Sequence, residues 1–111
     1  MRELSLTRRG LGMADLPRPD LVTLAQGGDV QAIGALYDQH HQALFRYLWS
    51  RVGERQTAEE LTGDVFMRML AALPRYRPSV VPFRAWLFRI AHNLLVDHYR
   101  KESGRVALSL Q

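Results

Sequence analysis

The sequence contains no cysteine among its 111 residues. A chain without thiols cannot form a disulfide framework, cannot bind a metal through thiolates and has no cysteine nucleophile. This absence is typical of proteins from reducing compartments, so we expect a cytoplasmic location.

Long hydrophobic runs are also missing. The longest apolar stretches, such as 43–49 and 94–96, are interrupted or bounded by polar residues, among them Arg46 and Asp97. A helix that crosses a bilayer needs about 20 apolar residues, so the sequence predicts no membrane span. The proportions of 47% hydrophobic and 23% charged residues favour one small globular domain.

The residue patterns of common catalytic sites are absent as well. There is no glycine-rich phosphate loop, no Ser/His/Asp ordering and no pair of carboxylates in an apolar setting. Adjacent His40 and His41, and His92 with His98, do not have the three- or four-residue spacing that places two imidazoles on one helix face. The sequence therefore predicts neither an enzyme nor a metal or cofactor site.

Arginine makes up nearly all of the positive charge, and it is unevenly distributed. The net charge is +4; residues 1–70 carry eight arginines against nine acidic residues, whereas residues 71–111 carry seven basic residues against two acidic ones. Guanidinium groups suit phosphate and base contacts, so the asymmetry favours a C-terminal third that binds a polyanion. A GC-rich coding sequence would also raise the arginine content, so charge alone leaves nucleic-acid binding open.

The spacing of apolar residues predicts an all-α fold, a compact bundle of about four helices. Residues 1–19 have no sustained period and are expected to form a flexible leader. Asp20 caps a short helix that ends at Gly27–Gly28, and Asp29 caps a second helix that Gly53 terminates.

Two further helices follow. Thr57 and Glu60 have the spacing of a capping box, so a third helix begins just after Thr57 and ends where the proline-containing loop 74–81 starts. A fourth helix runs from Pro82 to a stop at Ser103–Gly104. The predicted core consists of apolar residues at helical spacing: Ile33, Leu36, Tyr37, Leu44, Leu48, Val52, Leu61, Val65, Phe66, Met69, Leu70, Leu73, Phe83, Leu87, Ile90 and Leu94.

One polar stripe of the fourth helix is a candidate binding surface. At 100° per residue, Arg89, Asn93 and Arg100 share one face, and Trp86 borders both this face and the core. Guanidinium, amide and aromatic groups together can bind phosphates, base edges and base faces. The alternative is an ordinary solvated helix face with Trp86 in the core, and the pattern does not distinguish the two.

Three acidic residues, Glu59, Glu60 and Asp64, lie on the outer side of the third helix. Acidic residues in a first turn stabilise a helix through its dipole and increase solubility. The same group could instead form an acidic docking face for a basic partner helix.

Six blocks of the sequence form a known pattern. They are Asp20-Leu21-Val22, Gly28-Asp29, Leu36-Tyr37, Ala58-Glu59-Glu60-Leu61, Asp64-Val65-Phe66 and the run Phe83-Arg84-Ala85-Trp86-Leu87-Phe88-Arg89-Ile90-Ala91-His92-Asn93-Leu94-Leu95-Val96-Asp97. The last block is highly specific. With these blocks, the chain from Asp20 to about Arg105 resembles region 2 of the extracytoplasmic-function (ECF) group of bacterial RNA polymerase sigma factors.

The resemblance implies a function in transcription initiation. The third helix would dock on the β′ clamp helices of core RNA polymerase, and the loop and fourth helix would melt the minus-ten promoter element and hold its non-template strand. The expected polymerase-binding residues are Glu59, Glu60, Asp64 and Phe66. The expected DNA-binding residues are Arg75, Tyr76, Arg77, Trp86, Arg89, Asn93, Arg100 and Lys101, with Asn93 in the block that lines the pocket for a flipped base.

The chain departs from the family pattern in two places and in extent. Gly63 stands where the family usually has glutamine, and Ser79-Val80-Val81-Pro82 replaces a more polar loop. We expect 20–105 to be the region 2 domain and 106–111 to begin a linker or tail, with no C-terminal helix-turn-helix domain in this chain, as in a fragment.

An anti-sigma factor is a further expected partner. The alternative function is a module that binds only protein, such as a decoy that binds an anti-sigma factor.

Overall fold

The computed structural model describes residues 20–109, with side chains described up to residue 105. This part of the chain forms four α-helices, α3 (Leu21–Gln26), α4 (Val30–Val52), α5 (Arg55–Ala72) and α6 (Phe83–Ser109), and a short 3-10 helix, η2 (Leu73–Arg75). It contains no strand, so the predicted all-α fold is confirmed. The predicted leader, 1–19, lies outside the described residues.

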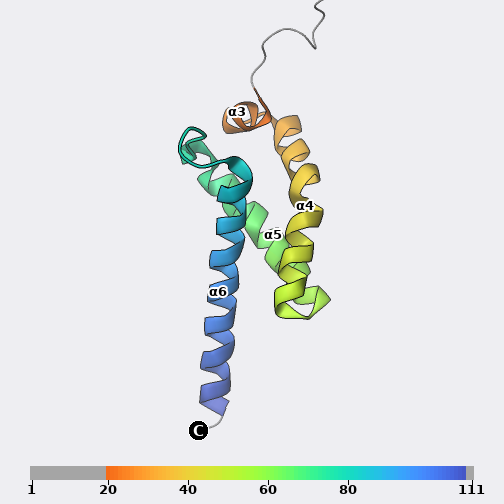
Figure 1. The fold of residues 1–111 in the computed structure, drawn as a ribbon, viewed down its shortest axis with the longest axis vertical. Helices are drawn as coiled ribbons and strands as arrows, with labels where there is room; N and C mark the ends of the chain where they lie inside the picture. Colours follow the sequence, from red (N-terminus) through yellow and green to blue (C-terminus); the bar gives the residue numbers. More distant parts are fainter. Residues whose placement is uncertain (1–19, 110–111) are drawn as a thin grey trace, which may run out of the picture.

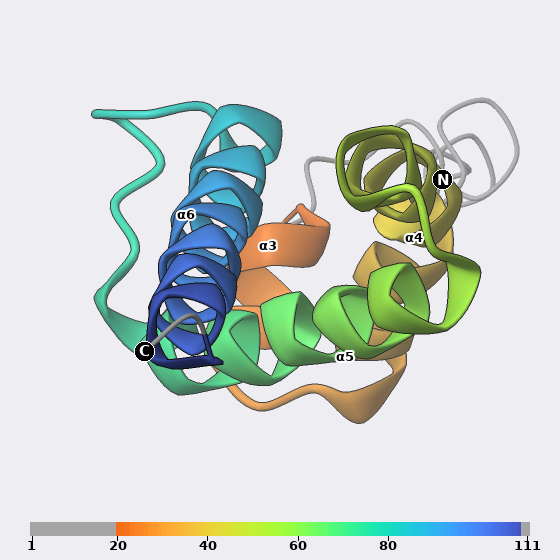
Figure 2. The same cartoon turned by 90° about the horizontal axis from the view of Figure 1, so that it is seen from below.

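The three long helices pack around one core. α4 and α6 flank the bundle, and α5 crosses obliquely from the lower end of α4 to the upper end of α6 (Figure 1). α3 lies between the upper parts of α4 and α6, as the view from below shows (Figure 2). The last turns of α6 extend past the other helices, and no side chain between Val96 and Arg105 is buried.

The predicted caps of the first two helices are present. The Asp20 carboxylate accepts a hydrogen bond from the Thr23 amide at 2.8 Å, and the Asp29 carboxylate accepts one from the Ala32 amide at 3.1 Å. Gly53 adopts a left-handed conformation, with φ of 75°, and ends α4. A side chain at this φ would strain the backbone, which explains a glycine here.

The start of α5 and the end of α6 differ from the prediction. α5 begins at Arg55, and the Thr57 hydroxyl donates to the carboxylate of Glu54 instead of capping the helix. α6 continues through Gly104 to Ser109. Gly104 has no positive φ, so it does not end the helix, and an ion pair between Glu102 and Arg105 spans this turn at 3.1 Å.

The core largely follows the predicted apolar positions. Leu44 and Leu48 of α4, Val65 and Met69 of α5 and Leu87 of α6 are almost completely buried. A smaller apolar cluster, made by Ala25, Ala32, Leu36 and Leu73, joins α3 to the bundle. Tyr37, which belongs to the apolar pattern predicted for the second helix, and Leu70, predicted beside the apolar stripe of the third, lie outside the core: Tyr37 is 42% and Leu70 41% exposed.

No helix within residues 20–109 is both long enough and apolar enough to span a membrane.

Candidate nucleic-acid interface

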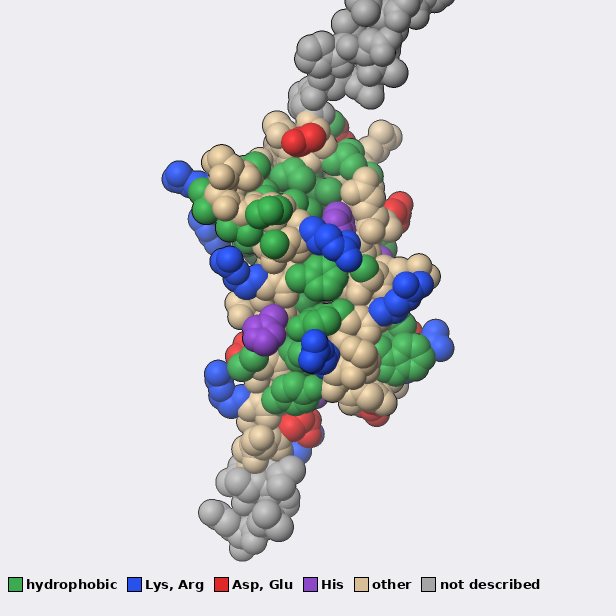
Figure 3. Space-filling model, viewed as in Figure 1, with side chains coloured by type: hydrophobic (Ala, Val, Ile, Leu, Met, Phe, Trp, Pro, Cys, Tyr) green, Lys and Arg blue, Asp and Glu red, His purple; other side chains and the backbone are tan. Residues whose placement is uncertain are grey.

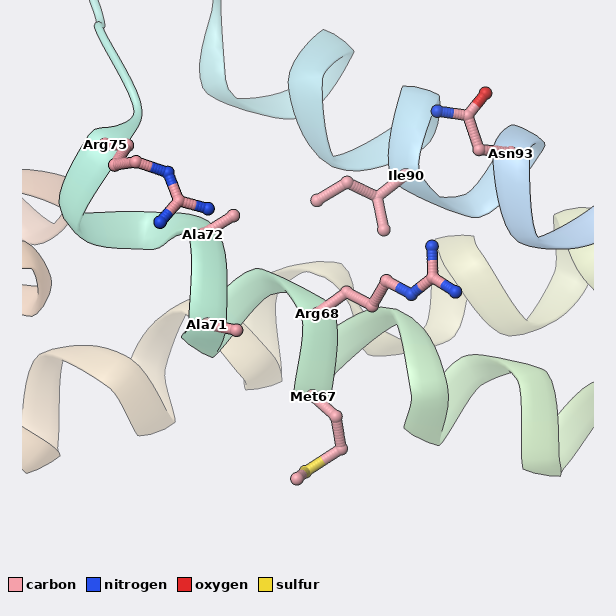
Figure 4. Close-up of a pocket in the computed structure, with 7 residues that line it drawn as sticks. All are labelled: Met67, Arg68, Ala71, Ala72, Arg75, Ile90 and Asn93. Atoms are coloured by element: carbon pink, nitrogen blue, oxygen red, sulfur yellow. The ribbon is translucent and has the colours of Figure 1, made fainter.

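A pocket of about 430 Å³ lies between the C-terminal half of α5 and the middle of α6. Figure 4 shows Arg68 and Arg75 extending from α5 and η2 into the space beside α6, with Ile90 pointing into it. Asn93 also lines the pocket from α6, and its amide points away from the two guanidinium groups. The lining is completed by Met67, Ala71 and Ala72. Pockets of this size fit a small ring system such as a nucleobase.

The charge of this pocket is positive. Two guanidinium groups, those of Arg68 and Arg75, line it without a carboxylate. Neither arginine takes part in the ion pairs found among the described side chains. Guanidinium groups free of carboxylates can donate to phosphate oxygens, while the Asn93 amide offers one donor and one acceptor to a base edge.

Sequence analysis missed Arg68, although a signal for it exists. Arg68 and Arg75 are seven residues apart, about two helical turns, and so lie on the same side of the chain as it continues from α5 into η2. The alanines at 71 and 72 between them leave the space that the pocket occupies. The predicted residues that the structure brings together here are therefore Arg75 and Asn93.

The other basic residues expected to bind DNA are exposed but do not line this pocket. Arg77 and Arg89 face solvent, as does Lys101. Arg100 lies on the extension of α6, where its guanidinium is 3.5 Å from the Asp97 carboxylate. This pair is exposed, so it holds Arg100 only weakly.

Tyr76 was expected among the DNA-binding residues, but its aromatic ring is not exposed. It is 7% exposed; its ring centroid lies 4.6 Å from that of Trp86 and 5.8 Å from that of Phe83, and its hydroxyl donates to the carbonyl of Val81. Trp86 is half-buried beside it. The Tyr76 side chain thus packs under the loop 76–82 and holds it against the start of α6.

A second contact holds the beginning of the same loop. The Gln26 side-chain amide, on α3, donates to the carbonyl of Leu73 at 3.1 Å and to that of Tyr76 at 2.8 Å. The loop is therefore fixed at its first residue by Gln26 and tied to Val81 near its end by the Tyr76 hydroxyl.

Burial, together with the negative charge of Asp20, raises the pKa of the Tyr76 phenol.

The predicted polymerase-binding residues divide into two groups. Glu59, Glu60 and Asp64 are exposed on α5, and the Glu59 carboxylate lies 3.4 Å from the Arg55 guanidinium. Phe66 is buried, and its ring supports the exposed ring of Tyr37 with centroids 4.6 Å apart. Tyr37, which the sequence placed in the core, is therefore the aromatic group that a partner on this side can reach.

Gly63 lies at a hollow next to these residues. The hollow, of about 480 Å³, is lined by Tyr37, His41, Gln42, Phe45, Arg55, Glu59, Thr62 and Gly63. A Cβ at Gly63 would meet no atom within 4 Å. The space beside Gly63 thus lies open between α4 and α5.

Within the described residues, no three His, Asp or Glu side chains gather as a metal site requires.

Comparison with known proteins agrees with this geometry. Residues 36–105 match the model of the Sigma-70 region 2 family. The chain is 39% identical over 90 residues to the ECF RNA polymerase sigma factor BldN of Streptomyces coelicolor, covering 81% of this chain and 34% of that protein. It is 34% identical over 71 residues to the RNA polymerase sigma factor YlaC of Bacillus subtilis, covering 64% of this chain and 40% of that protein.

A solved structure has the same fold. It is the 1.8 Å structure of the RsbN-BldN complex, which matches with a TM-score of 0.68 and 43% sequence identity over 74% of this chain and 59% of that one. The chain belongs to the Sigma-70 region 2 family, and its relatives are sigma factors of the ECF group. It spans less than half the length of either curated relative.

Proposed function

We propose that this chain is the part of an ECF sigma factor that binds core RNA polymerase, melts the minus-ten promoter element and holds its non-template strand. The observation that carries the proposal is the pocket between α5 and α6, lined by Asn93 and by two arginines that form no ion pair with a described side chain. RNA polymerase is cytoplasmic in bacteria, so the proposed place of action is the cytoplasm.

The chemistry of the pocket suits a base that has left its stack. Unstacking a base costs a few kcal/mol, which new contacts must offset. Ile90 supplies an apolar surface, and the Asn93 amide can hydrogen-bond a base edge. Arg68 and Arg75 supply donors for the adjacent phosphates, which would make binding depend steeply on salt.

The buried position of Tyr76 gives it an indirect part in this proposal. Its contacts with Trp86 and Val81 hold the loop 76–82 in one arrangement before any ligand binds. A preformed loop loses less conformational entropy on binding than a flexible one. Arg77, which this loop carries, is thereby presented to the phosphate chain.

The polymerase contact is proposed for the exposed face of α5. Glu60 and Asp64 face solvent with no ion pair among the described residues, while Glu59 of the same helix lines a hollow together with the exposed Tyr37 of α4. Carboxylates on a helix that also borders an exposed ring suit a basic helix with apolar side chains. The β′ clamp helices of core polymerase are the partner that the family relationship suggests.

Fluorescence anisotropy with a labelled non-template minus-ten strand, in the presence of core polymerase, tests the proposal. Arg68→Gln should weaken strand binding several-fold and reduce its salt dependence by about 0.7 in log K against log salt, the value for one phosphate contact. Arg46→Gln, which removes an exposed arginine of α4 outside the pocket, is the matched control. Equal effects of the two variants on strand affinity would show that the strand does not bind at the pocket.

A protein-only module, such as a decoy that binds an anti-sigma factor, is the second candidate. It is favoured by the similar solved structure, in which BldN is in complex with another protein, RsbN. The same anisotropy experiment separates the two functions, because a decoy would leave the labelled strand unbound with and without core polymerase.

A further inference from the structure

Two arginines flank a pair of aromatic rings at the seam where α4 meets α6. The Arg84 guanidinium lies over the Phe88 ring at 4.8 Å, and the Phe88 and Tyr47 ring centroids are 5.6 Å apart. The Arg51 guanidinium lies over the other ring of this pair, that of Tyr47, at 5.1 Å. We call these four residues the arginine–aromatic row; Figure 3 shows blue side chains lying among green ones along the middle of this face.

The two arginines of the row are exposed and form no ion pair with an acidic side chain in the described part of the chain. The ion pairs among the described side chains are Arg55–Glu59, Arg100–Asp97 and Arg105–Glu102, none of which involves the row. Tyr99 adds an exposed ring to the two half-buried rings of the row, since its hydroxyl donates to the Arg51 carbonyl. The row therefore presents two fixed guanidinium groups and apolar ring edges.

The row lies on a different side of α6 from the proposed DNA pocket. Counted from Phe83 at 100° per residue, Arg84 and Phe88 lie at about 100° and 140°, whereas Asn93 lies at about 280°. A strand held at Asn93 would thus leave the row uncovered. A ligand bound to the row would therefore be separate from the proposed strand site.

The stacking of the arginines indicates the kind of ligand. Each guanidinium already lies over a ring, so the faces of Phe88 and Tyr47 are not open to bases in the way that single-strand-binding surfaces require. Stacking leaves the guanidinium N–H edges free, and these edges bind carboxylates in a bidentate manner. Ring edges beside them suit apolar side chains.

We propose that the arginine–aromatic row is a docking site for an acidic segment of a partner protein that also carries apolar side chains. Carboxylates of this segment bind Arg51 and Arg84, and its apolar residues pack against Tyr47, Phe88 and Tyr99. The charge complementarity is specific to this face, because the exposed face of α5 carries the opposite charge in Glu60 and Asp64.

Nuclear magnetic resonance titration of the full, isotope-labelled chain tests the site. The probe is a synthetic peptide of alternating glutamate and leucine, compared with the same peptide carrying glutamine in place of glutamate. The acidic peptide should shift the signals of Arg51, Arg84 and the rings of the row, and the glutamine peptide should not. An oligothymidylate serves as the nucleic-acid probe and should leave the row unshifted.

Substitutions then assign the contact to the two arginines. The double variant Arg51→Gln with Arg84→Gln should weaken the acidic peptide about tenfold or more, and Arg→Lys at both positions should retain part of the affinity because the charge remains. Arg46→Gln, an exposed arginine with no ring contact, is the control and should have little effect.

Thermal unfolding of each variant checks that the fold is intact. Unchanged peptide affinity in the folded double variant would overturn the proposal. Absence of peptide binding, or binding of the oligothymidylate at the row in place of the peptide, would also overturn it.

Discussion

Gln26 should contribute more to the free energy of unfolding than a half-buried residue of a short helix usually does. Its side-chain amide donates two hydrogen bonds, to the carbonyls of Leu73 and Tyr76, which lie 47 and 50 positions further along the chain. Replacing Gln26 by alanine removes both. At roughly 1 kcal/mol per hydrogen bond, the free energy of unfolding should fall by about 1 to 3 kcal/mol.

The substitution Gln26→Glu makes the test sharper. A carboxylate has nearly the same shape as the amide but only accepts hydrogen bonds, so it would face two carbonyl oxygens with no donor. The loss at neutral pH should exceed that of Gln26→Ala. The folded state would raise the pKa of this introduced carboxyl, so the deficit relative to wild type should shrink as the pH falls toward 4 and protonation restores one donor.

Urea unfolding followed by circular dichroism measures these differences. Gln31, an exposed residue of α4 with no side-chain hydrogen bond in the structure, provides matched controls as Gln31→Ala and Gln31→Glu. If the Gln26 variants unfold at the same urea concentration as the Gln31 variants, the amide does not hold α3 to the loop and the reasoning is refuted.

Three other predictions follow from single residues. Gly63→Ala should raise the free energy of unfolding by about 0.5 to 1 kcal/mol, because alanine has a higher helix propensity than glycine and the new Cβ has no neighbouring atom within 4 Å. A lower melting temperature of this variant would contradict the prediction. Because the pKa of Tyr76 is raised above 10.0 in the folded state, its contribution to stability is complete below pH 10 and should be lost as the pH rises further. Tyr76→Phe should flatten this alkaline loss in pH-dependent unfolding, and an unchanged profile would assign the loss to other groups. Asp64→Lys should weaken binding to isolated β′ clamp helices several-fold without changing helical content; an undiminished affinity in a titration would remove this face from the polymerase contact.

Local sequence signals predicted most of the fold because they act over a few residues. Asp20, Asp29 and Gly53 each determine a helix end through contacts within four positions. The start of α5 was missed because the Thr57 hydroxyl had two local partners available, and the sequence does not show that it donates to the preceding Glu54. Gly104 was a misleading stop signal, since glycine permits a helix end without requiring one.

The site was predicted less completely because it depends on how helices cross. The exposed positions of Arg89 and Asn93 followed from the helical period alone. The seven-residue spacing of Arg68 and Arg75 can be read in the sequence, but their position beside Asn93 depends on how α5 packs against α6. The burial of Tyr76 likewise depends on Trp86 and Val81 together. Contacts between distant positions of this kind leave no periodic signal in the sequence.

The base preference of the strand bound at Asn93 tests the central proposal most directly. The measurement is the anisotropy of labelled non-template minus-ten strands, each carrying one of the four bases at one position, bound to the chain with core polymerase. Asn93→Ala should cost roughly 1 to 3 kcal/mol for the preferred base and remove the discrimination at one position, because the Asn93 amide is the group proposed to read a base edge. His92→Ala, at the exposed neighbouring position, should keep that discrimination. Full base preference in the Asn93→Ala variant would contradict the account and make Asn93 an ordinary surface amide.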